Sequence, residues 1–531
     1  MKILIILFMF YVGALYAQFQ NVKVSSDSSR QPNEVSIAIN PVNTKLVAAG
    51  SNLKYYFASD NEGANWNEQT MSSLKLGVWG DPCVLYDGNG NLFYAHLSNP
   101  PTDGYWVDRI VIQKSTDNGI NWNDGVGVGY NPPKNQDKEW LAVDLTNSNY
   151  RNNLYVAWTE FDKYGSADPN DSSRILFSHS SDEGNTWSDA VRVSDKGGDC
   201  IDSDSTVEGA VPAVGPNGEV YLSWAGPLGI MFDKSLDGGS TFGRDIFVTD
   251  QPGGWDFAIS GIYRANGMPI TACDISNSNY RGNIYINWSD QRNGADNTDI
   301  FFIKSTDGGN SWGKLIKVND DNTSRHQFFT WMSIDQTDGN IYIVFYDRRN
   351  TTGVATDVYI ARSTNGGDSF ENFKISDSSF TPREEVFFGD YINIDSHKNE
   401  IRPIWMRMDN GILSIYTAII SDSNLITGTD IVENISNSYQ LYQNYPNPFN
   451  PTTTIKYSIP FVETLHATSQ QSIQLKVYDI LGREVKTLVN KEQPPGIYEV
   501  TFDASNLPSG MYIYKILANG FGITRKMLLL K

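Results

Sequence analysis

The sequence of 531 residues is longer than one ordinary domain and predicts two to four domains. Hydrophobic residues make up 40% of the chain and charged residues 19%, which excludes a largely disordered protein. The 41 Lys and Arg against 61 Asp and Glu give a net charge of −20. This balance excludes nucleic acid as a partner, because binding to phosphates needs a basic surface.

The chain begins with a predicted signal peptide, residues 1–17. Lys2 supplies the positive charge, residues 3–15 are mostly apolar, and Ala17 is a small residue suited to cleavage. The apolar run is shorter than the roughly 20 residues that a membrane-spanning helix needs, and no later run is long and apolar enough to span. We therefore expect export, with no transmembrane segment in the mature protein.

Cysteine and histidine usage argues against a metal centre. The three cysteines, Cys83, Cys200 and Cys273, are an odd number and cannot form a complete disulfide framework. No CxxC motif or paired-histidine spacing occurs, and the chain has only 5 His. The sequence predicts no metal site and no cofactor.

A short repeat predicts the fold of the N-terminal four-fifths. Segments of the form S-x-D-x-G-x-x-W/F, or a near variant, lie at 59–66, 115–122, 180–187, 235–242, 305–312 and 363–370. The Asp or Asn side chain can accept backbone N–H groups, Gly supplies a positive φ, and the aromatic ring packs on a sheet. These segments resemble the Asp box, or BNR repeat, of sialidases and related β-propellers.

Counting the strands between the boxes gives the number of blades. Pairs of strand-like segments such as WLAVD and LYVAW recur seven times with period-2 alternation. The last pair lacks a fourth strand, and residues 21–27 (NVKVSSD) resemble the fourth strands of the other units. We expect an all-β, seven-bladed Asp-box propeller over residues 18–430, closed by the N-terminal strand, with six blades as the alternative.

The composition changes in the last hundred residues. Residues 431–452 are rich in Pro and Asn and predict a linker, and residues 453–531 predict a small immunoglobulin-like β-sandwich. YPNPFNPTTTI, VYDILGREVKTLV and GIYEVTFDASNLPSGMYIYKI, in this order, closely resemble the C-terminal sorting domain of type IX secretion cargo. The resemblance implies the type IX secretion machinery as a partner and a secreted or outer-membrane cell-surface location.

Charged residues gather in the loops that a propeller brings to one face, those before first strands and after second strands. Paired carboxylates there suit glycoside hydrolysis, and arginines suit a carboxylated sugar. The candidate catalytic residues are Glu139, Glu160 and Tyr391, and the candidate ligand-binding residues are Arg30, Arg292, Arg348 and Arg383. Alternatively, SDQR (289–292) and YDRR (346–349) hold Asp–Arg pairs that connect adjacent blades.

The resemblance to sialidases is incomplete. Arg30-Gln31-Pro32 resembles the Arg-x-Pro of the first sialidase strand, and Tyr391 resembles the nucleophilic tyrosine. However, NPVNTKLVAAGSNLKYYF (40–57) lacks the acid/base aspartate, and seven blades differ from the six of sialidases. The resemblance therefore does not determine the reaction.

Two functions fit these patterns. The first is a sialidase-like propeller that engages extracellular carbohydrate, either as a glycoside hydrolase or as a lyase of acidic glycans. It predicts that Glu139, Glu160, Arg292, Arg348 and Tyr391 converge in one pocket. The second is a non-catalytic propeller that binds a glycan or a surface protein, in which the Asp–Arg pairs satisfy one another. Fold alone does not decide between them.

Overall fold

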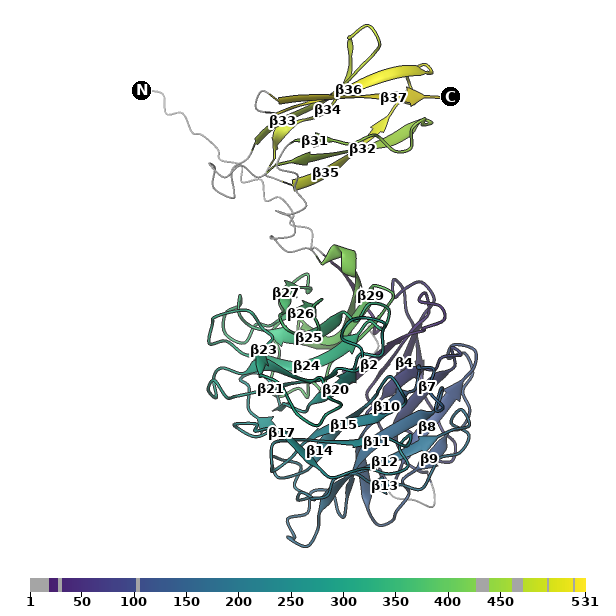
Figure 1. Ribbon diagram of the computed structural model, residues 1–531, viewed down its shortest axis with the longest axis vertical. Coiled ribbons are helices and arrows are strands. Elements are labelled where there is room, and N and C mark those ends of the chain that lie inside the picture. Colours follow the sequence, from purple (N-terminus) through teal and green to yellow (C-terminus); the bar gives the residue numbers. More distant parts are fainter. Residues whose placement is uncertain are drawn as a thin grey trace. The chain divides into compact units, whose positions relative to one another are not determined.

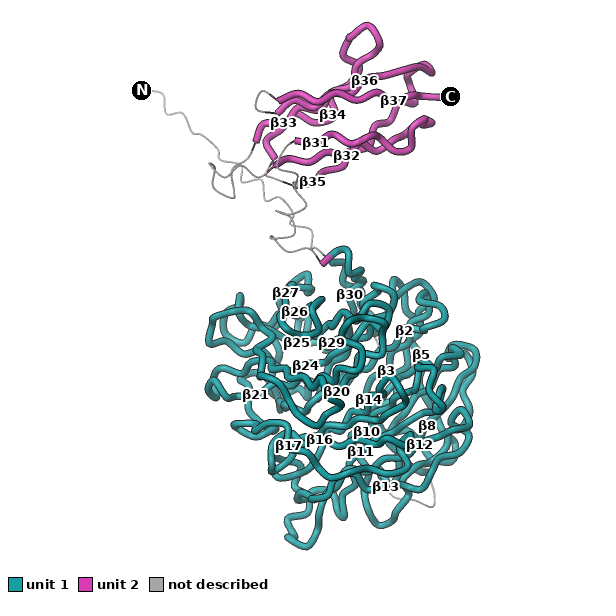
Figure 2. Tube along the Cα trace, in the orientation of Figure 1, with its two compact units in different colours: residues 1–424 teal, residues 425–531 magenta. Residues whose placement is uncertain are grey.

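The computed structural model describes residues 19–26, 31–101, 106–425, 439–460, 471–493, 496–518 and 521–531. The predicted signal peptide, residues 1–17, lies outside this set. The chain divides into two compact units, residues 1–424 and residues 425–531 (Figure 2). In the described part of the chain, no helix is long and apolar enough to cross a membrane.

The described residues of unit 1 form seven four-stranded antiparallel sheets (Figure 1). Six sheets consist of consecutive strands, and the first two are β2 (Val35–Ile39), β3 (Val47–Ser51), β4 (Tyr55–Ser59) and β5 (Asn67–Thr70), then β6 (Cys83–Tyr86), β7 (Leu92–Leu97), β8 (Ile110–Ser115) and β9 (Val126–Val128). The third and fourth are β10 (Asn135–Val143), β11 (Leu154–Phe161), β12 (Ser173–Ser180) and β13 (Val191–Arg192), then β14 (Glu208–Val214), β15 (Val220–Ala225), β16 (Ile230–Ser235) and β17 (Ile246–Thr249). The fifth and sixth are β20 (Ile270–Cys273), β21 (Ile284–Asp290), β22 (Asp299–Ser305) and β23 (Ile316–Lys317), then β24 (Gln327–Ile334), β25 (Ile341–Asp347), β26 (Asp357–Ser363) and β27 (Glu371–Lys374). The seventh sheet consists of β28 (Asn393–His397), β29 (Glu400–Asp409), β30 (Ile412–Ser421) and β1 (Gln20–Lys23). The small elements outside the sheets are β18 (Asp256–Phe257), β19 (Ala265–Asn266) and the 3-10 helix η1 (Asp422–Asn424).

The sheets close into a ring. The first strands contact one another in the order β2, β6, β10, β14, β20, β24 and β28, and β28 contacts β2 again. The N-terminal strand β1 pairs antiparallel with β30, from Gln20 opposite Ile419 to Lys23 opposite Tyr416. The predicted all-β propeller class is confirmed, and the strand that completes the last sheet is the predicted one.

The second strands of the sheets carry the largest buried side chains. They alternate aromatic and β-branched residues, as expected for strands buried on both faces. Four fully buried tryptophans lie on β11, β15, β21 and β29: Trp158, Trp224, Trp288 and Trp405. The core of unit 1 is therefore divided among the interfaces between neighbouring sheets.

Each Asp box forms the same hydrogen-bonded turn between a third and a fourth strand. In the box at 115–122, the Ser115 hydroxyl accepts the Gly119 N–H at 2.8 Å and donates to Asp117 Oδ1 at 2.8 Å. Asp117 Oδ1 also accepts the Asn121 N–H at 2.9 Å. Gly119 has a φ of +80°, a conformation that glycine adopts without a steric penalty. These bonds satisfy the turn internally, so the box serves structure.

The aromatic residue that ends a box packs on the preceding sheet. The ring of Phe242 lies 5.0 Å from that of Phe177, and the ring of Trp312 lies 5.1 Å from that of Phe232. Both pairs are close to edge-to-face, an arrangement that aromatic rings favour. The spacing of the boxes in the sequence therefore reflects the packing of each terminal ring against the preceding sheet.

Unit 2 is a small β-sandwich. One sheet has the order β31 (Gln440–Leu441), β32 (Thr452–Ile459) and β35 (Gly496–Asp503), and the other has the order β34 (Glu484–Gln493), β33 (Gln471–Tyr478), β36 (Gly510–Ala518) and β37 (Phe521–Leu529). Both sheets contribute to one buried cluster, which includes Ile455, Phe502, Leu475 and Tyr514.

The predicted linker differs in part from the structure. Residues 431–438 lie outside the described set, but Leu441 and Phe449 are 1% and 2% exposed and belong to the core of unit 2. Tyr445 bridges to Thr454, so the Pro-rich stretch folds back along β32. Proline prevents regular pairing here, but it does not prevent the apolar side chains between the prolines from packing.

Candidate functional site

Strained residues lie where the first strands begin. Glu34, Asp81 and Lys138 have φ angles of +49°, +54° and +52°, in the left-handed region that disfavours side chains. At Lys138 the pairing of β10 with β11 shifts register, which marks a bulge. Such conformations cost about 1–3 kcal/mol each and concentrate at functional sites. Three of them at equivalent points of neighbouring sheets direct attention to the axis of the ring.

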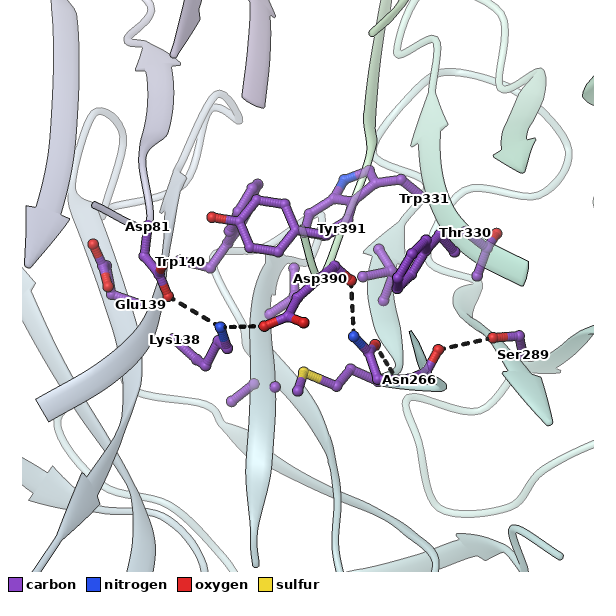
Figure 3. Close-up of a pocket in the computed structure, with 16 residues that line it drawn as sticks. Asp81, Lys138, Glu139, Trp140, Asn266, Ser289, Thr330, Trp331, Asp390 and Tyr391 are labelled. Carbon is purple, nitrogen blue, oxygen red and sulfur yellow. Dashed lines mark hydrogen bonds and ion pairs between the residues drawn. The ribbon is translucent and has the colours of Figure 1, made fainter. Parts of the chain in front are cut away.

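Lys138 joins carboxylates from three other sheets. Its Nζ lies 2.7 Å from Asp390 Oδ2, 3.3 Å from Asp81 Oδ2 and 3.5 Å from Glu34 Oε1. Figure 3 shows the ammonium between Asp81 and Asp390. Burial opposes the charge of this amine, but the surrounding carboxylates outweigh burial and raise the pKa of Lys138.

Arg264 extends the network. Its Nε donates to Asp390 Oδ1 at 2.7 Å, its Nη2 also donates to Asp390, and its Nη1 lies 3.3 Å from Asp202 Oδ2. The Tyr164 hydroxyl donates to Asp202 Oδ2 at 2.7 Å. Burial alone would raise the pKa of Asp390, but Lys138 and Arg264 outweigh burial and hold that pKa well below its usual value. Asp390 is therefore an ionised carboxylate that both cations share.

Carboxyl groups outnumber cations around the axis. The acidic residues are Glu34, Asp81, Asp137, Glu139, Asp202, Glu208 and Asp390, against the cations Lys138 and Arg264. Burial, followed by repulsion from neighbouring carboxylates, raises the pKa of Glu34, Glu139 and Glu208 well above the usual value. Burial also raises the pKa of Asp137 to about 8. Asp137 thus holds a proton at neutral pH.

An outer pocket of about 340 Å³ opens above this network. The residues used below are the carboxyl groups of Glu34, Asp81 and Asp137, the cations Lys138 and Arg264, and the rings of Trp79, Trp106, Tyr164 and Phe387. Trp106 and Tyr164 come from loops that follow second strands, and Asp81 and Asp137 precede or begin first strands. The predicted face is therefore the face that carries the pocket.

Aromatic rings wall the outer pocket. Trp106 lies edge-to-face with Trp79 at 5.9 Å and with Tyr164 at 6.0 Å. The ring of Trp106 is 44% exposed, although a ring of this size is mostly buried in a folded protein. The wall combines flat apolar surface with carboxyl groups, a combination common in pockets that bind small molecules.

A smaller inner pocket of about 40 Å³ shares Asp81 and Lys138 with the outer pocket. Its wall includes Glu139, Trp140, Trp331 and Tyr391 (Figure 3). The Trp140 ring lies 4.2 Å from that of Trp331 and 5.6 Å from that of Tyr391.

Two of the predicted catalytic residues meet at the inner pocket. Glu139 is 1% exposed, and neither of its carboxyl oxygens has a hydrogen-bond partner. The buried hydroxyl of Tyr391 also lacks a partner. Burial, and then the charge of Asp81, raise the pKa of Tyr391 well above its ordinary value, so the phenol stays neutral. A neutral phenol fits a hydrogen-bonding role better than the nucleophilic role that the sialidase resemblance implies.

The structure does not bring the other predicted residues into this pocket. Glu160 lies on β11 and accepts bonds from Arg174 at 2.7 Å and Lys134 at 3.1 Å. Arg292 donates to Asp290 at 2.9 Å and to the Asp250 carbonyl at 3.0 Å, which belongs to the preceding sheet's outgoing loop. These groups are ion-paired within the protein, as the structural alternative expected for Asp–Arg pairs.

The remaining arginines are also placed elsewhere. Arg348 is 1% exposed and donates to the Ser260 carbonyl at 2.9 Å and to Thr356 Oγ1 at 3.0 Å. Burial, and then the charge of Arg325, lower its pKa to about 10. Arg383 lies in an exposed turn, and Arg30 lies outside the described residues. The predicted convergence of five residues thus reduces to Glu139 and Tyr391.

Residues 443–530 match the family described as the secretion system C-terminal sorting domain. They are a secretion sorting domain. The predicted type IX sorting domain is confirmed, and the protein is exported to the cell surface or the extracellular space. No curated protein was found to match the chain.

Several solved structures are similar to the chain. They include the NanB sialidase of Streptococcus pneumoniae, at 9% identity and a TM-score of 0.43, covering 78% of this chain and 99% of that one. An α-L-arabinofuranosidase of Fusarium graminearum has 11% identity and a TM-score of 0.41, covering 76% and 98%. An ulvan lyase has 12% identity and a TM-score of 0.46, covering 76% and 96%. The similarity is one of general architecture.

We expect Glu160→Gln to affect stability and not substrate recognition. The substitution removes the charge that meets Arg174 and Lys134, so the free energy of unfolding should fall by about 1–3 kcal/mol. Denaturant unfolding measures this loss. Any glycan bound by the parent chain should bind to folded Glu160→Gln protein with unchanged affinity; a weakened affinity would place Glu160 at the ligand.

The central cation of the site was absent from the candidate residues. Lys138 stands between Asp137 and the candidate catalytic residue Glu139. Strict alternation would turn Lys138 away from its neighbours, but the bulge lets all three contribute to the axis. Three consecutive charges at the start of an inner strand are the signal that could have revealed it. In the described part of the chain, no group of His, Cys, Asp or Glu is arranged to hold a metal ion.

Proposed function

We propose that unit 1 binds an extracellular carbohydrate in the outer pocket and cleaves it with Asp137 as the general acid. The observation that carries this proposal is a carboxyl group that keeps its proton at neutral pH inside an aromatic-walled pocket. Asp137 has a pKa raised to about 8 by burial, and it shares the pocket with Trp79 and Trp106. A general acid works best when its pKa lies near the operating pH.

The pocket supports glycoside chemistry in two further ways. Its volume of about 340 Å³ lies within the range of roughly 300–1,000 Å³ that small-molecule sites occupy. Asp81 lies in the same wall and supplies the second carboxyl group that glycoside hydrolysis needs. The export signal places the pocket where extracellular glycans are available.

The non-catalytic alternative fits part of the face. Arg292 with Asp290 and Arg349 with Asp347 are mutually satisfied pairs, as that alternative predicts. Asp137 and Glu139 stand outside such pairs with Arg, and neither carboxyl oxygen of Glu139 has a hydrogen-bond partner from another residue. These unpartnered oxygens of Glu139 favour a site that receives a ligand.

A screen of the full chain tests the proposal. Reducing-end release from polysaccharides and from fluorogenic glycosides, neutral, amino-substituted and acidic, should identify at least one cleaved substrate. Binding on a glycan array without cleavage would instead support a non-catalytic surface protein. Absence of both cleavage and binding would contradict carbohydrate as the ligand.

Trp106→Ala should weaken binding of the glycan found in this screen by about tenfold or more, because truncating a central aromatic residue in a binding site costs about 2 kcal/mol or more. The matched control is Phe247→Ala, which removes a ring that is 56% exposed on the outer strand β17. Isothermal titration measures both affinities. Equal affinities for the two variants would show that the ligand does not contact the outer pocket.

A further inference from the structure

The inner pocket has room for a very small group. Its volume of about 40 Å³ admits a group of the size of a water molecule, which needs roughly 10–15 Å³ on the same measure. Its wall includes the rings of Trp140, Trp331 and Tyr391. An ammonium or hydroxyl group fits this volume.

The polar atoms in this wall that lack a partner can accept hydrogen bonds from a ligand. Both oxygens of Glu139 are buried without a partner, although buried carboxyl oxygens are almost always hydrogen-bonded. The hydroxyl of Tyr391 is buried and equally unpartnered. An ammonium group offers three N–H donors, which the carboxylate oxygens of Glu139 and the oxygen of Tyr391 can accept.

Among the described residues that line the two pockets, the cations are Lys138 and Arg264, and both face carboxylates. The Lys138 ammonium faces Asp390, Asp81 and Glu34, one carboxylate for each of its three N–H donors. The three nitrogens of the Arg264 guanidinium face Asp390 and Asp202. A uronic or sialic acid entering this site would meet excess carboxyl groups, and the two described cations of the lining already face carboxylates.

A cation entering the inner pocket would relieve the repulsion among these carboxyl groups. Glu139 stands near Asp81, whose charge contributes to the raised pKa of Glu139. The aromatic rings add to the attraction, since ammonium groups bind to the faces of Trp and Tyr rings. Charge and hydrogen bonding therefore favour the same group, and its size fits the pocket.

We propose that the inner pocket binds a primary ammonium group, carried by a non-acetylated amino sugar whose ring occupies the outer pocket. This assignment rests on the proposed function, since it takes the ligand to be a carbohydrate. It reverses the expectation of an acidic glycan.

Three methyl glycosides that share one ring test the assignment on the full chain. Methyl glucosaminide, methyl glucoside and methyl glucuronide differ only in an amino group at C2 or a carboxylate at C6. Titration at slightly acidic pH, where the amine is protonated, should give the glucosaminide an affinity at least about tenfold above the glucoside, with the glucuronide weakest. Because burial raises the pKa of Glu139, an ammonium ligand that draws this carboxyl group into its ionised form should also release protons, which titrations in two buffers measure.

The Glu139→Gln substitution tests whether the preference for the amine arises in the inner pocket. The substitution keeps the shape of the side chain and removes its ability to ionise, so the preference for the amine over the hydroxyl should fall close to one, while the glucoside binds as before. Glu62→Gln, in an Asp box on the opposite face, should leave the preference intact.

The outcomes separate the two proposals. Equal or tighter binding of the glucoside or the glucuronide overturns the ammonium site and leaves carbohydrate binding standing. Absence of binding by all three glycosides overturns both. A preference for the amine that persists in Glu139→Gln overturns the inner pocket as its location.

Discussion

Replacing Asp137 by Asn is expected to lower kcat on a cleaved glycan by about 10²–10⁴-fold, the contribution usual for a positioned general acid. Asn has the shape of Asp but no proton to donate. The affinity for substrate should change little, because Trp79 and Trp106 still form the wall of the pocket. Single-turnover and steady-state kinetics on the substrate found by the screen separate the two effects.

The pH dependence of the same reaction follows from the state of Asp137. Burial raises the pKa of this carboxyl group to about 8, so the acid is protonated at neutral pH and loses its proton as the pH rises through that value. We expect kcat to be constant below about pH 7 and to fall about tenfold per pH unit above pH 8. The decline should vanish from the residual activity of Asp137→Asn.

Asp60→Asn is the matched control for these measurements. Asp60 is exposed in the first Asp box, on the face opposite the pocket, and its replacement should leave kcat and its pH profile unchanged. A parent profile that stays flat well above pH 9, or full activity in Asp137→Asn, would contradict the assignment of Asp137 as the acid.

The architecture of unit 1 was predictable because its determinants are local and repeated. The box at 115–122 makes its hydrogen bonds within five residues, so its sequence alone predicts the turn. The closing strand was predictable for a related reason: residues 21–27 have the pattern of a fourth strand, and the last repeat lacked one. Repetition strengthens such predictions, because each copy of the pattern supports the assignment of the other copies.

The side chains of the site were predicted less well than its face. Topology places the loops before first strands together, and Asp81, Asp137, Glu139 and Asp390 do surround the axis. Which side chains of these loops pair with one another depends on how the ring of sheets closes in three dimensions. The spacing of the residues in the sequence therefore does not predict the pairs. Arg292 and Arg348 lie in the expected loops, but the first is held by its neighbour Asp290 and the second is buried against backbone.

The same closure explains why Lys138 was missed and why it matters. A lysine one residue from the predicted Glu139 has no reason, from sequence, to meet Glu34 and Asp390, which are 104 residues before and 252 residues after it. The left-handed backbone at Lys138 is what directs its ammonium to the axis. Lys138 therefore has two effects. Its ammonium offsets part of the negative charge of the pocket, and its ion pairs connect the last sheet to the first three.

Lys138→Met is expected to lower the free energy of unfolding of unit 1 by about 3–5 kcal/mol, the usual cost of removing one partner from a buried ion pair. Met keeps the length of the side chain but leaves Asp390, Asp81 and Glu34 without their shared ammonium. Arg264 still pairs with Asp390, so the loss should stop short of preventing folding. Burial already raises the pKa of Glu34, so without the ammonium its ionised form becomes more costly, and the variant should be least stable at high pH.

Tryptophan fluorescence during denaturant unfolding of the full chain measures this loss for unit 1 alone, because all 13 Trp residues lie between Trp66 and Trp405. The matched control is Lys54→Met, which replaces an exposed lysine and should change the free energy of unfolding by no more than about 0.5 kcal/mol. If Lys138→Met unfolds within about 1 kcal/mol of the parent chain, the ammonium is not what holds the carboxylates together across the axis. The ring would then be closed by β1 and the interfaces between sheets, and Lys138 would be free to act on the ligand instead.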